Sequence, residues 1–342
     1  MEKHTTIAVD LSKTVFEIAV SRYLGRVCER KRLNRAQLVP FFANRPPATV
    51  LLEACGSAHH WARQIGPLGH RVLLLPPHQT RRYVLRDKTD GADAEALLEA
   101  HRNEKIIPVP VKSIAQQTLT ALHRIRSGWV QTRIARLNAI RGLLRELGLF
   151  IPLGPRHVLP ALAGFLSDPG QPIPVQLHPS LLTFAAEIRT LEQNIRESDR
   201  HLITFARHCA DAARFLTIPG IGVLGATALV GFVGPLGRFR SGRRFSSSLG
   251  IVPKEHSSGP RRHLGSITKR GDPYLRTLLI HGARSALVAA SRAKHPDRLQ
   301  AWALRLKQRR GHNCTAVALA NKIARIAWAL SVHQTNYRST PA

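Results

Sequence analysis

The sequence predicts an α/β domain at the N-terminus, followed by a helical middle region and a mostly helical C-terminal region. Three observations lead to this fold class. Short β-branched runs alternate with helix-like segments up to residue 75. Apolar residues then recur every three or four positions from residue 113. Glycine-rich turns separate shorter apolar segments after residue 215, and we therefore divide the chain into residues 1–110, 111–210 and 211–342.

The N-terminal region begins with two strand-like runs, Thr5–Asp10 and Thr14–Val20, separated by three turn-like residues. Such a pair predicts a β-hairpin. Further elements are expected as strands at 27–33, 49–53 and 71–75 and as helices between Asn34 and Asn44 and between Ser57 and Ile65. Strands and helices that alternate after an opening meander are typical of a mixed α/β sheet with helices on its faces.

The middle region has the pattern of long amphipathic helices. One helix is predicted from about Ser113 to Leu147, and a Pro/Gly-rich stretch at 151–179 interrupts the pattern before it resumes at Leu182. Two long helices joined by a loop suggest a helical hairpin or coiled coil that spaces two domains or dimerises. An ordinary helical subdomain fits the same pattern equally well.

The third region starts near Phe215, where the run Ile218–Gly222 precedes the apolar segment Ala226–Val230. Two glycines around one apolar residue, between helical segments, resemble a helix-hairpin-helix element. In such an element Gly220 and Gly222 let the backbone approach a phosphate of nucleic acid. The alternative is a plain glycine-containing turn, because short glycine patterns are common.

The charge balance points to nucleic acid as a partner. The chain has 342 residues with 51 Lys and Arg against 21 Asp and Glu, a formal net charge of +30. Residues 201–342 hold 19 of these surplus charges. Such an excess repels itself unless a polyanion is near. No apolar run reaches the roughly 20 residues of a membrane span, and no secretory signal is visible, so we expect a cytoplasmic protein without a membrane role.

Four carboxylates form a candidate metal site. Asp10 closes the first strand, Glu53 closes a later strand, and Asp90 and Asp93 stand where a helix begins. Helical positions three apart share a face, so Asp90 and Asp93 can point at one ligand. Clustered carboxylates repel one another, and a divalent cation relieves that repulsion, with Mg²⁺ as the default and Mn²⁺ as the other choice. Alternatively, these acids only cap a helix or start a turn.

A hydroxyl-rich loop, Ser257–Gly259, lies within a basic stretch of the C-terminal region. The candidate phosphate contacts around it are Arg261, Arg262, Lys269, Arg270 and Arg276. A serine in this setting is either a phosphate anchor or a nucleophile. The chemistry alone favours the anchor, because most serines near phosphate only donate a hydrogen bond.

Two resemblances extend this reading. One acid follows the first strand of a meander, another lies on a central strand, and a pair lies on a later helix. This arrangement of acids resembles that of the RNase H-like (RuvC-like) fold. Nearly the whole chain resembles the DEDD transposases of insertion-sequence family 110, which include the pilin-gene invertases. The motifs that carry this likeness are Ala8–Asp10, Leu52–Glu53, Lys88–Ala94, Ile218–Gly222, Leu249–Pro253, Ser257–Gly259 and Ile267–Gly271.

The family resemblance implies a mechanism and partners. The DEDD acids correspond to Asp10, Glu53, Asp90 and Asp93, and the family's nucleophilic serine corresponds to Ser258, which would form a phosphoserine link to DNA. Donor and target DNA, a structured bridge RNA and a homo-oligomer, either a dimer or a tetramer, are the implied partners. Two departures stand out: Pro260 replaces a glycine common in relatives, and Ser257 precedes the matching serine.

Two other functions compete with this interpretation. A metal-dependent junction nuclease would use only the carboxylates and water, with the C-terminal region as a DNA clamp. A non-catalytic nucleic-acid-binding protein would use the acids only structurally. The sequence does not predict which DNA sites are joined, because the side chains of a guided enzyme do not determine them.

Overall fold

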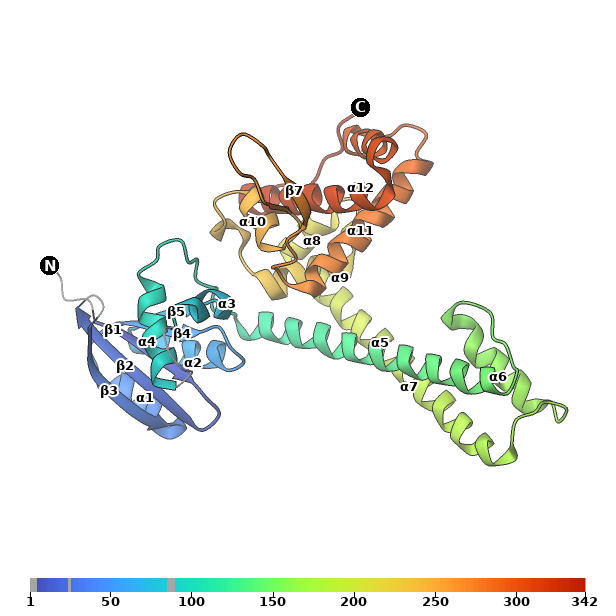
Figure 1. The fold of residues 1–342 in the computed structure, drawn as a ribbon, viewed down its shortest axis with the longest axis horizontal. Coiled ribbons are helices and arrows are strands. Elements are labelled where there is room, and N and C mark those ends of the chain that lie inside the picture. The colour runs from blue at the N-terminus through green and yellow to red at the C-terminus, as the bar shows by residue number, and fades with distance from the viewer. Residues whose placement is uncertain (1–4, 24–25, 85–89, 342) are drawn as a thin grey trace. The chain divides into compact units, whose positions relative to one another are not determined.

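The computed structural model describes residues 5–23, 26–84 and 90–341 and separates the chain into two units, residues 1–113 and 114–342 (Figure 1). The N-terminal unit contains a five-stranded sheet in the order β3-β2-β1-β4-β5. Strands β1, β2 and β3 are antiparallel, whereas β1, β4 and β5 are parallel. The elements of this unit are β1 Thr6–Leu11, β2 Val15–Tyr23, β3 Arg26–Asn34, α1 Arg35–Ala43, β4 Thr49–Glu53, α2 Ala58–Ile65, β5 Arg71–Leu75, α3 Pro77–Thr80 and α4 Asp90–His101.

Side-chain alternation along the strands gives this sheet two apolar faces. Ile7, Val9 and Val50 share a core with residues of α1 and α2, whereas Ala8 and Leu51 share a second core with residues of α4. Successive strand residues point to opposite faces, so both faces of the central strands are apolar. The predicted mixed α/β sheet covered by helices is confirmed, and so is each strand and helix expected within residues 5–75.

The C-terminal unit begins with a helical hairpin. Its elements are α5 Ile114–Glu146, α6 Val158–Ser167 and α7 His178–His208. Ion pairs join α5 to α7 at Arg126–Asp199 (2.6 Å), Arg133–Glu192 (3.8 Å) and Arg136–Glu187 (2.6 Å). Along these pairs the residue number rises in α5 and falls in α7, so the two helices are antiparallel.

The sequence pattern predicted the two long helices but missed α6, which lies inside the Pro/Gly-rich stretch. Pro160 stands in the first turn of α6, where a backbone N–H has no partner within the helix, so this proline does not break it. Val158 and Leu162 of α6 are buried in one core with Ile140 of α5 and Ile188 of α7. Tertiary packing therefore stabilises a helix that is too short to stand out in the sequence.

The rest of the C-terminal unit is mostly helical around one apolar core. Its elements are α8 Ala210–Leu216, α9 Val223–Ala228, a π-helical turn Leu229–Val233, α10 Gly242–Ser248, β6 Pro253–Glu255, β7 Leu264–Ile267, α11 Pro273–Arg292 and α12 Arg298–His333. Asp272 caps α11, and Asp297 forms a capping box with Gln300 at the start of α12. Helix α12 breaks at Gly311, whose φ is 76°. No helix within the described residues is both long and apolar enough to cross a membrane.

A buried histidine connects the long helix α5 to this core. His123 is fully buried, and its Nδ1 and Nε2 lie 3.0 Å from the hydroxyls of Tyr274 and Thr227. The Thr227 hydroxyl donates to the carbonyl of Val223, so it accepts from Nε2–H, and Nδ1 accepts from Tyr274. Both ring nitrogens are thus satisfied in the neutral form. Burial, and then the charge of Arg126, lower the pKa of His123 to about 4.

We expect acid to destabilise the C-terminal unit through His123. Its pKa falls from 6.5 to about 4 on folding, so the unfolded chain binds more protons between these values. Stability is therefore fully present above pH 6.5 and falls by up to on the order of 3 kcal/mol as the pH drops through 4. Thermal unfolding across this range should show a weaker pH dependence in His123→Gln than in the wild type. An identical pH dependence in both proteins would contradict this assignment.

Candidate functional site

Asp10 and Glu53 lie next to each other at the C-terminal ends of two neighbouring inner strands. Strands β1 and β4 are parallel, and their register pairs Val9 with Leu52, the residues just before the two acids. Ala8 and Leu51 face the core formed with α4, and each acid stands two positions further along its strand. Because side chains alternate, both carboxylates belong to the face covered by α4. Both side chains are half-buried.

Helix α4 brings Asp93 to the same face. Ala94 and Leu97 of α4 are buried against the sheet. Asp93 lies four positions before Leu97, so it belongs to the helix stripe that faces the sheet. Asp93 is half-buried and makes no hydrogen bond or ion pair with other described residues. The backbone of Asp90 begins the helix, but its side chain lies outside the described residues.

The carboxylates fit a hard divalent cation in their chemistry. Oxygen atoms, such as those of carboxylates, are the ligands that Mg²⁺ and Mn²⁺ prefer. The acids further along α4 are neutralised differently: Glu95 pairs with Arg30, and Glu99 pairs with Arg102. Among side chains that the structure describes, no three His, Cys, Asp or Glu residues gather closely enough to hold a metal ion, and Asp90 is not among those side chains.

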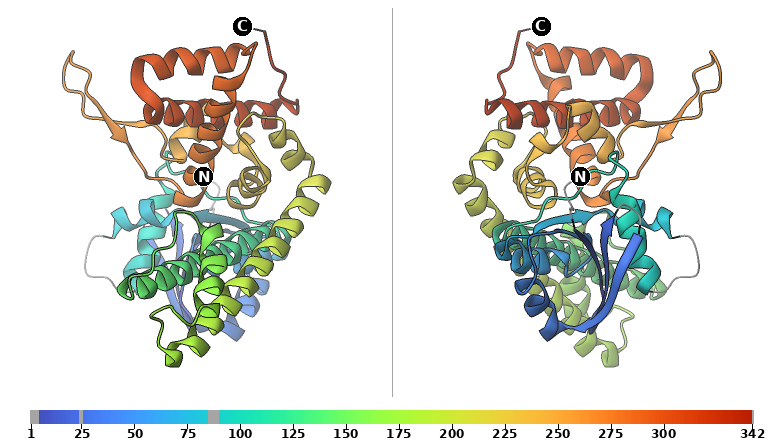
Figure 2. Two further views of the ribbon diagram at one scale, coloured as in Figure 1. Left: turned by 90° about the vertical axis from the view of Figure 1, so that its right-hand side faces the viewer. Right: turned by 90° about the vertical axis from the view of Figure 1, so that its left-hand side faces the viewer.

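Ser258 lies near the tip of an exposed β-hairpin in the C-terminal unit. Strands β6 and β7 are antiparallel, and the ladder continues to an isolated bridge between Ser258 and Arg261. All residues from 253 to 266 are exposed. Figure 2 shows this hairpin, in orange, extending away from the helices of its unit. The outer part of this two-stranded ribbon is therefore accessible to solvent on both faces.

The turn of the hairpin explains why Pro260 is tolerated. Gly259 has a φ of 57°, in the left-handed region that favours glycine. A two-residue type II′ turn needs positive φ only at its first central position. Pro260 occupies the second position, where its fixed negative φ fits. The departure from the family's second glycine is therefore compatible with the same hairpin.

The two neighbouring serines have different surroundings. The Ser257 hydroxyl donates to Oε1 of Glu255 (2.8 Å) and accepts from the backbone N–H of His263 (3.1 Å). The Ser258 hydroxyl makes no hydrogen bond within the described part of the chain. The hydrogen bond from Ser257, and then the charge of Arg262, lower the pKa of Glu255, which makes it a weak base for activating Ser257. Ser257 therefore braces the hairpin, whereas the Ser258 hydroxyl has no hydrogen-bond partner among the described residues.

Sequence analysis did not select Glu255 as a residue of this site. Its signal was nevertheless present, because it is the only Asp or Glu between residues 212 and 271 of a strongly basic region. An isolated acid among cations is a candidate structural partner for several of them. Here it accepts from Ser257 and pairs with Arg262 (3.2 Å).

The candidate phosphate contacts are not equivalent. Arg261, Lys269 and Arg270 are exposed and available to a polyanion. Arg262 is exposed but paired with Glu255. Arg276 is half-buried, and its guanidinium donates to the carbonyls of Leu249 (3.3 Å) and Gly271 (3.1 Å). In this arrangement Arg276 holds the base of the hairpin to α11.

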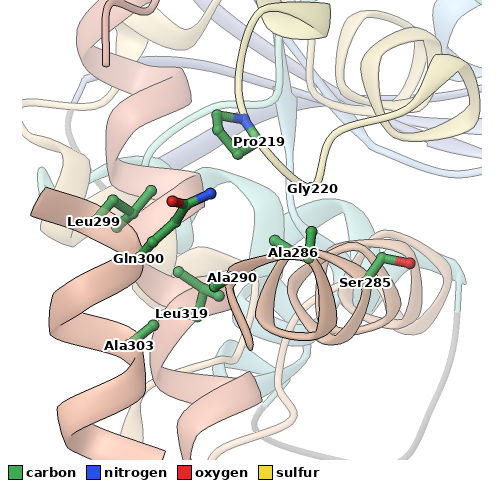
Figure 3. A pocket seen from close by; sticks show the side chains of 10 residues that line it. Pro219, Gly220, Ser285, Ala286, Ala290, Leu299, Gln300, Ala303 and Leu319 are labelled. Carbon is green, nitrogen blue, oxygen red and sulfur yellow. The ribbon is translucent and has the colours of Figure 1, made fainter. Parts of the chain in front are cut away.

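The loop with Gly220 and Gly222 connects α8 to α9. Gly220 has a φ of 90°, and its backbone packs directly against the backbone of Gly282 in α11. Figure 3 shows Pro219 and Gly220 at one wall of an adjacent cavity of about 270 Å³, with α11 residues such as Ala286 beneath them. The cavity lining is largely apolar. Close helix packing is thus a sufficient reason for glycine at position 220.

We expect Gly282→Ala to destabilise the C-terminal unit. A Cβ at this position would lie 1.8 Å from the carbonyl oxygen of Gly220, so the α8–α9 loop would have to move. Overpacking of this kind costs roughly 2–3 kcal/mol. Gly142→Ala in α5 is the matched control, because its Cβ would meet nothing within 4 Å and should stabilise the helix by about 0.5–1 kcal/mol. Denaturant unfolding of both variants measures the difference, and equal stabilities would refute the contact.

Comparison with known proteins identifies the family. A family model described as "Transposase IS116/IS110/IS902 family" matches residues 212–303, and the DEDD transposase model of the IS110 group, described as "Transposase", matches residues 7–148. A probable family 20 transposase of Pseudomonas aeruginosa is 43% identical over 97% of this chain and 98% of its own length. The chain belongs to the IS110 family of transposases.

Other relatives of this IS110-family transposase agree. The transposase for insertion sequence element IS1111A of Coxiella burnetii is 36% identical over 97% of the chain and 91% of its own length. The transposase for element IS1328 of Yersinia enterocolitica is 37% identical over 98% of the chain and 99% of its own length. The protein is therefore an enzyme that cuts and rejoins DNA, and its membership among DEDD transposases implies a divalent metal ion.

Proposed function

We propose that this transposase cuts and rejoins DNA through a covalent link between Ser258 and a DNA phosphate. The observation that carries the proposal is the unengaged hydroxyl of Ser258 near the tip of an exposed hairpin, beside a serine whose hydroxyl is occupied. In the forward step the Oγ of Ser258 attacks phosphorus, and the bond from phosphorus to one sugar oxygen breaks. The serine proton is lost, and the leaving oxygen takes up a proton.

Rejoining is the reverse reaction with a new strand. A sugar hydroxyl attacks the phosphoserine, and Ser258 leaves as a free hydroxyl. The phosphate ester energy is kept in the protein link, so no external energy source is needed. Arg261, Lys269 and Arg270 are the exposed cations that would hold the phosphates and offset charge in the transition state.

The carboxylates Asp10, Glu53, Asp90 and Asp93 would hold the metal, Mg²⁺ or Mn²⁺. When bound, the ion supplies Lewis-acid chemistry, which polarises the phosphate and eases deprotonation of the attacking hydroxyl. The proposal is supported by the position of Asp10, Glu53 and Asp93 on the face that β1, β4 and α4 share, and Asp90 is included by its place in the DEDD motif. In this proposal residues 1–110 form an RNase H-like catalytic domain, residues 111–210 a coiled-coil region, and residues 211–342 the serine-bearing domain.

The proposed partners are donor and target DNA, a structured bridge RNA and further copies of the chain. The net charge of +30 supports the nucleic acids, and we propose a cytoplasmic location because the DNA substrates would be found there. A homo-oligomer is supported by large apolar side chains beyond the ends of α5 and α7 that stand exposed: Phe150 (74%), Leu153 (90%) and Val175 (74%). We also keep Gly220 and Gly222 as a helix-hairpin-helix contact to a phosphate backbone.

Denaturing electrophoresis tests the proposal directly. The protein is incubated with DNA that carries the element ends, with a target, with RNA transcribed from the flanking sequence and with Mg²⁺, and the mixture is then denatured. We expect a protein–DNA adduct that survives denaturation and disappears on protease treatment. Metal-dependent cleavage and rejoining without any adduct would contradict the serine link and favour a mechanism that uses only the carboxylates and water.

A further inference from the structure

A second candidate site lies beneath the base of the β6–β7 hairpin, against α12. It is a cleft of about 740 Å³, a size within the roughly 300–1,000 Å³ of small-molecule sites. The hairpin contributes one wall through residues that include Ser266, and α12 contributes the other through Trp302, Lys322 and Arg325. The cleft is distinct from the carboxylates and from Ser258, none of which lines it.

The cleft combines an aromatic ring with cations and lacks acids. The ammonium of Lys322 lies 4.0 Å from the centroid of the half-buried Trp302 ring. Burial, and then the charges of Arg325 and Arg298, lower the pKa of Lys322. No Asp or Glu is among the residues that line the cleft. An anion is therefore the ligand group that this cluster of cations would bind most favourably.

Two side-chain amides supply hydrogen-bonding groups to the same cleft. Asn321 donates from Nδ2 to the carbonyl of Ile251 (3.2 Å), which fixes its orientation. Asn313 accepts from Arg284 through Oδ1 (3.3 Å), so its NH₂ group is left as a donor. An aromatic face, cations and amides are together the groups that recognise a nucleotide, by stacking, phosphate binding and base-edge hydrogen bonds.

We propose that this cleft binds one unpaired nucleotide of a nucleic-acid strand, with its base stacked on Trp302 and its phosphate held by Lys322 and Arg325. Stacking of a base on an aromatic ring stabilises a complex more than an exposed cation–π contact does. On binding, the base would replace the Lys322 ammonium on the Trp302 ring, and the ammonium would bind the phosphate instead. This exchange is therefore favourable.

The position of the cleft connects it to the proposed reaction. Pro253, at the start of β6, lines the cleft, and Ser258 lies five residues further, about 17 Å along an extended strand. An unpaired nucleotide held here would anchor the strand close to the reactive hairpin. The inference rests on the nucleic-acid function proposed above but does not depend on Ser258 as the nucleophile.

Fluorescence anisotropy with short labelled oligonucleotides tests the cleft. The probes are single-stranded DNA, single-stranded RNA and the DNA duplex of the same sequence, and the variants are Trp302→Leu, Trp302→Phe and Lys322→Gln. We expect Trp302→Leu to weaken single-strand binding about tenfold and to leave duplex binding unchanged, while Trp302→Phe stays close to wild type. The strand that shows the loss, DNA or RNA, identifies the source of the nucleotide.

Salt dependence supplies a second readout. Lys322→Gln should reduce the slope of log affinity against log salt by about 0.7 for a single strand. Lys294→Gln, an exposed cation outside the cleft, is the matched control and should leave binding unchanged. Unchanged single-strand binding by Trp302→Leu, or an equal loss for duplex and single strands, would overturn the inference. Ser258→Ala should bind single strands normally, so failure of the serine chemistry is distinguishable from failure of the cleft.

Discussion

Ser258→Ala is expected to abolish the protein–DNA adduct completely, whereas Ser257→Ala is expected to retain it. Removal of the Ser258 hydroxyl removes the attacking atom, and no neighbouring group can replace it in the same position. Removal of the Ser257 hydroxyl breaks its bonds to Glu255 and to the backbone of His263, which loosens the hairpin without removing a nucleophile. Quantitative electrophoresis of the adduct compares the two variants.

The control for this prediction is that the Ser258→Ala variant still folds, and the structure indicates that it will. Ser258 is exposed and its hydroxyl makes no hydrogen bond with another described residue, so Ser258→Ala should unfold like the wild type. Adduct formation by Ser258→Ala together with its loss in Ser257→Ala would transfer the nucleophile to Ser257. Unchanged strand cleavage by Ser258→Ala would instead support the nuclease mechanism.

Asp10→Asn and Glu53→Gln are expected to lower strand transfer by at least about 100-fold. Changes to outer-shell partners of a metal site alone cost about 10–100-fold, and under the proposed function these substitutions remove charged ligands themselves. Both replacements keep the shape of the side chain, so the sheet and its contact with α4 should persist. Strand-transfer rates over a series of Mg²⁺ and Mn²⁺ concentrations measure the loss.

Glu99→Gln is the matched control for the acids. Glu99 lies on the same helix as Asp93 but pairs with Arg102, and an exposed pair of this kind contributes little to stability. This variant should keep the wild-type rate and metal dependence. Full activity of Asp10→Asn would refute the assignment of the metal site, while equal losses in Glu99→Gln and Asp10→Asn would indicate a general effect of charge.

The sheet could be predicted because its signals are local. Val9 and Leu52 belong to short β-branched or aliphatic runs bounded by turns, and such runs specify strands without help from distant residues. The long helices α5 and α7 are likewise specified by a repeated apolar stripe. Helix α6 could not be found in this way, because its stability depends on packing against α5 and α7.

The candidate site was predictable to a different extent at each residue. The common face of Asp10 and Glu53 follows from strand alternation once the parallel pairing of β1 and β4 is known. The role of Arg276 could not be predicted, because its carbonyl partner Leu249 is 27 residues away in the chain. The same holds for Gly220, whose contact with Gly282 depends on the packing of α11.

The distinction between the two serines also required the structure. Their sequence context is the same run of hydroxyls, and only the ladder of the hairpin separates an engaged Ser257 from an unengaged Ser258. The choice of Ser258 from the sequence depended on resemblance to the DEDD transposases. The choice of Ser258 stays a prediction, and the structure adds that its hydroxyl is unengaged within the described residues.

Mass spectrometry of the trapped adduct tests the central claim most directly. The wild-type protein is reacted with DNA and guide RNA, denatured, and digested with a protease and a nuclease, and the peptide that carries the residual nucleotide is sequenced. The account predicts a nucleotide linked through phosphate to Ser258, in a peptide that is absent when Mg²⁺ and Mn²⁺ are withheld. A nucleotide linked to any other residue, or complete strand exchange without a linked peptide, would contradict it.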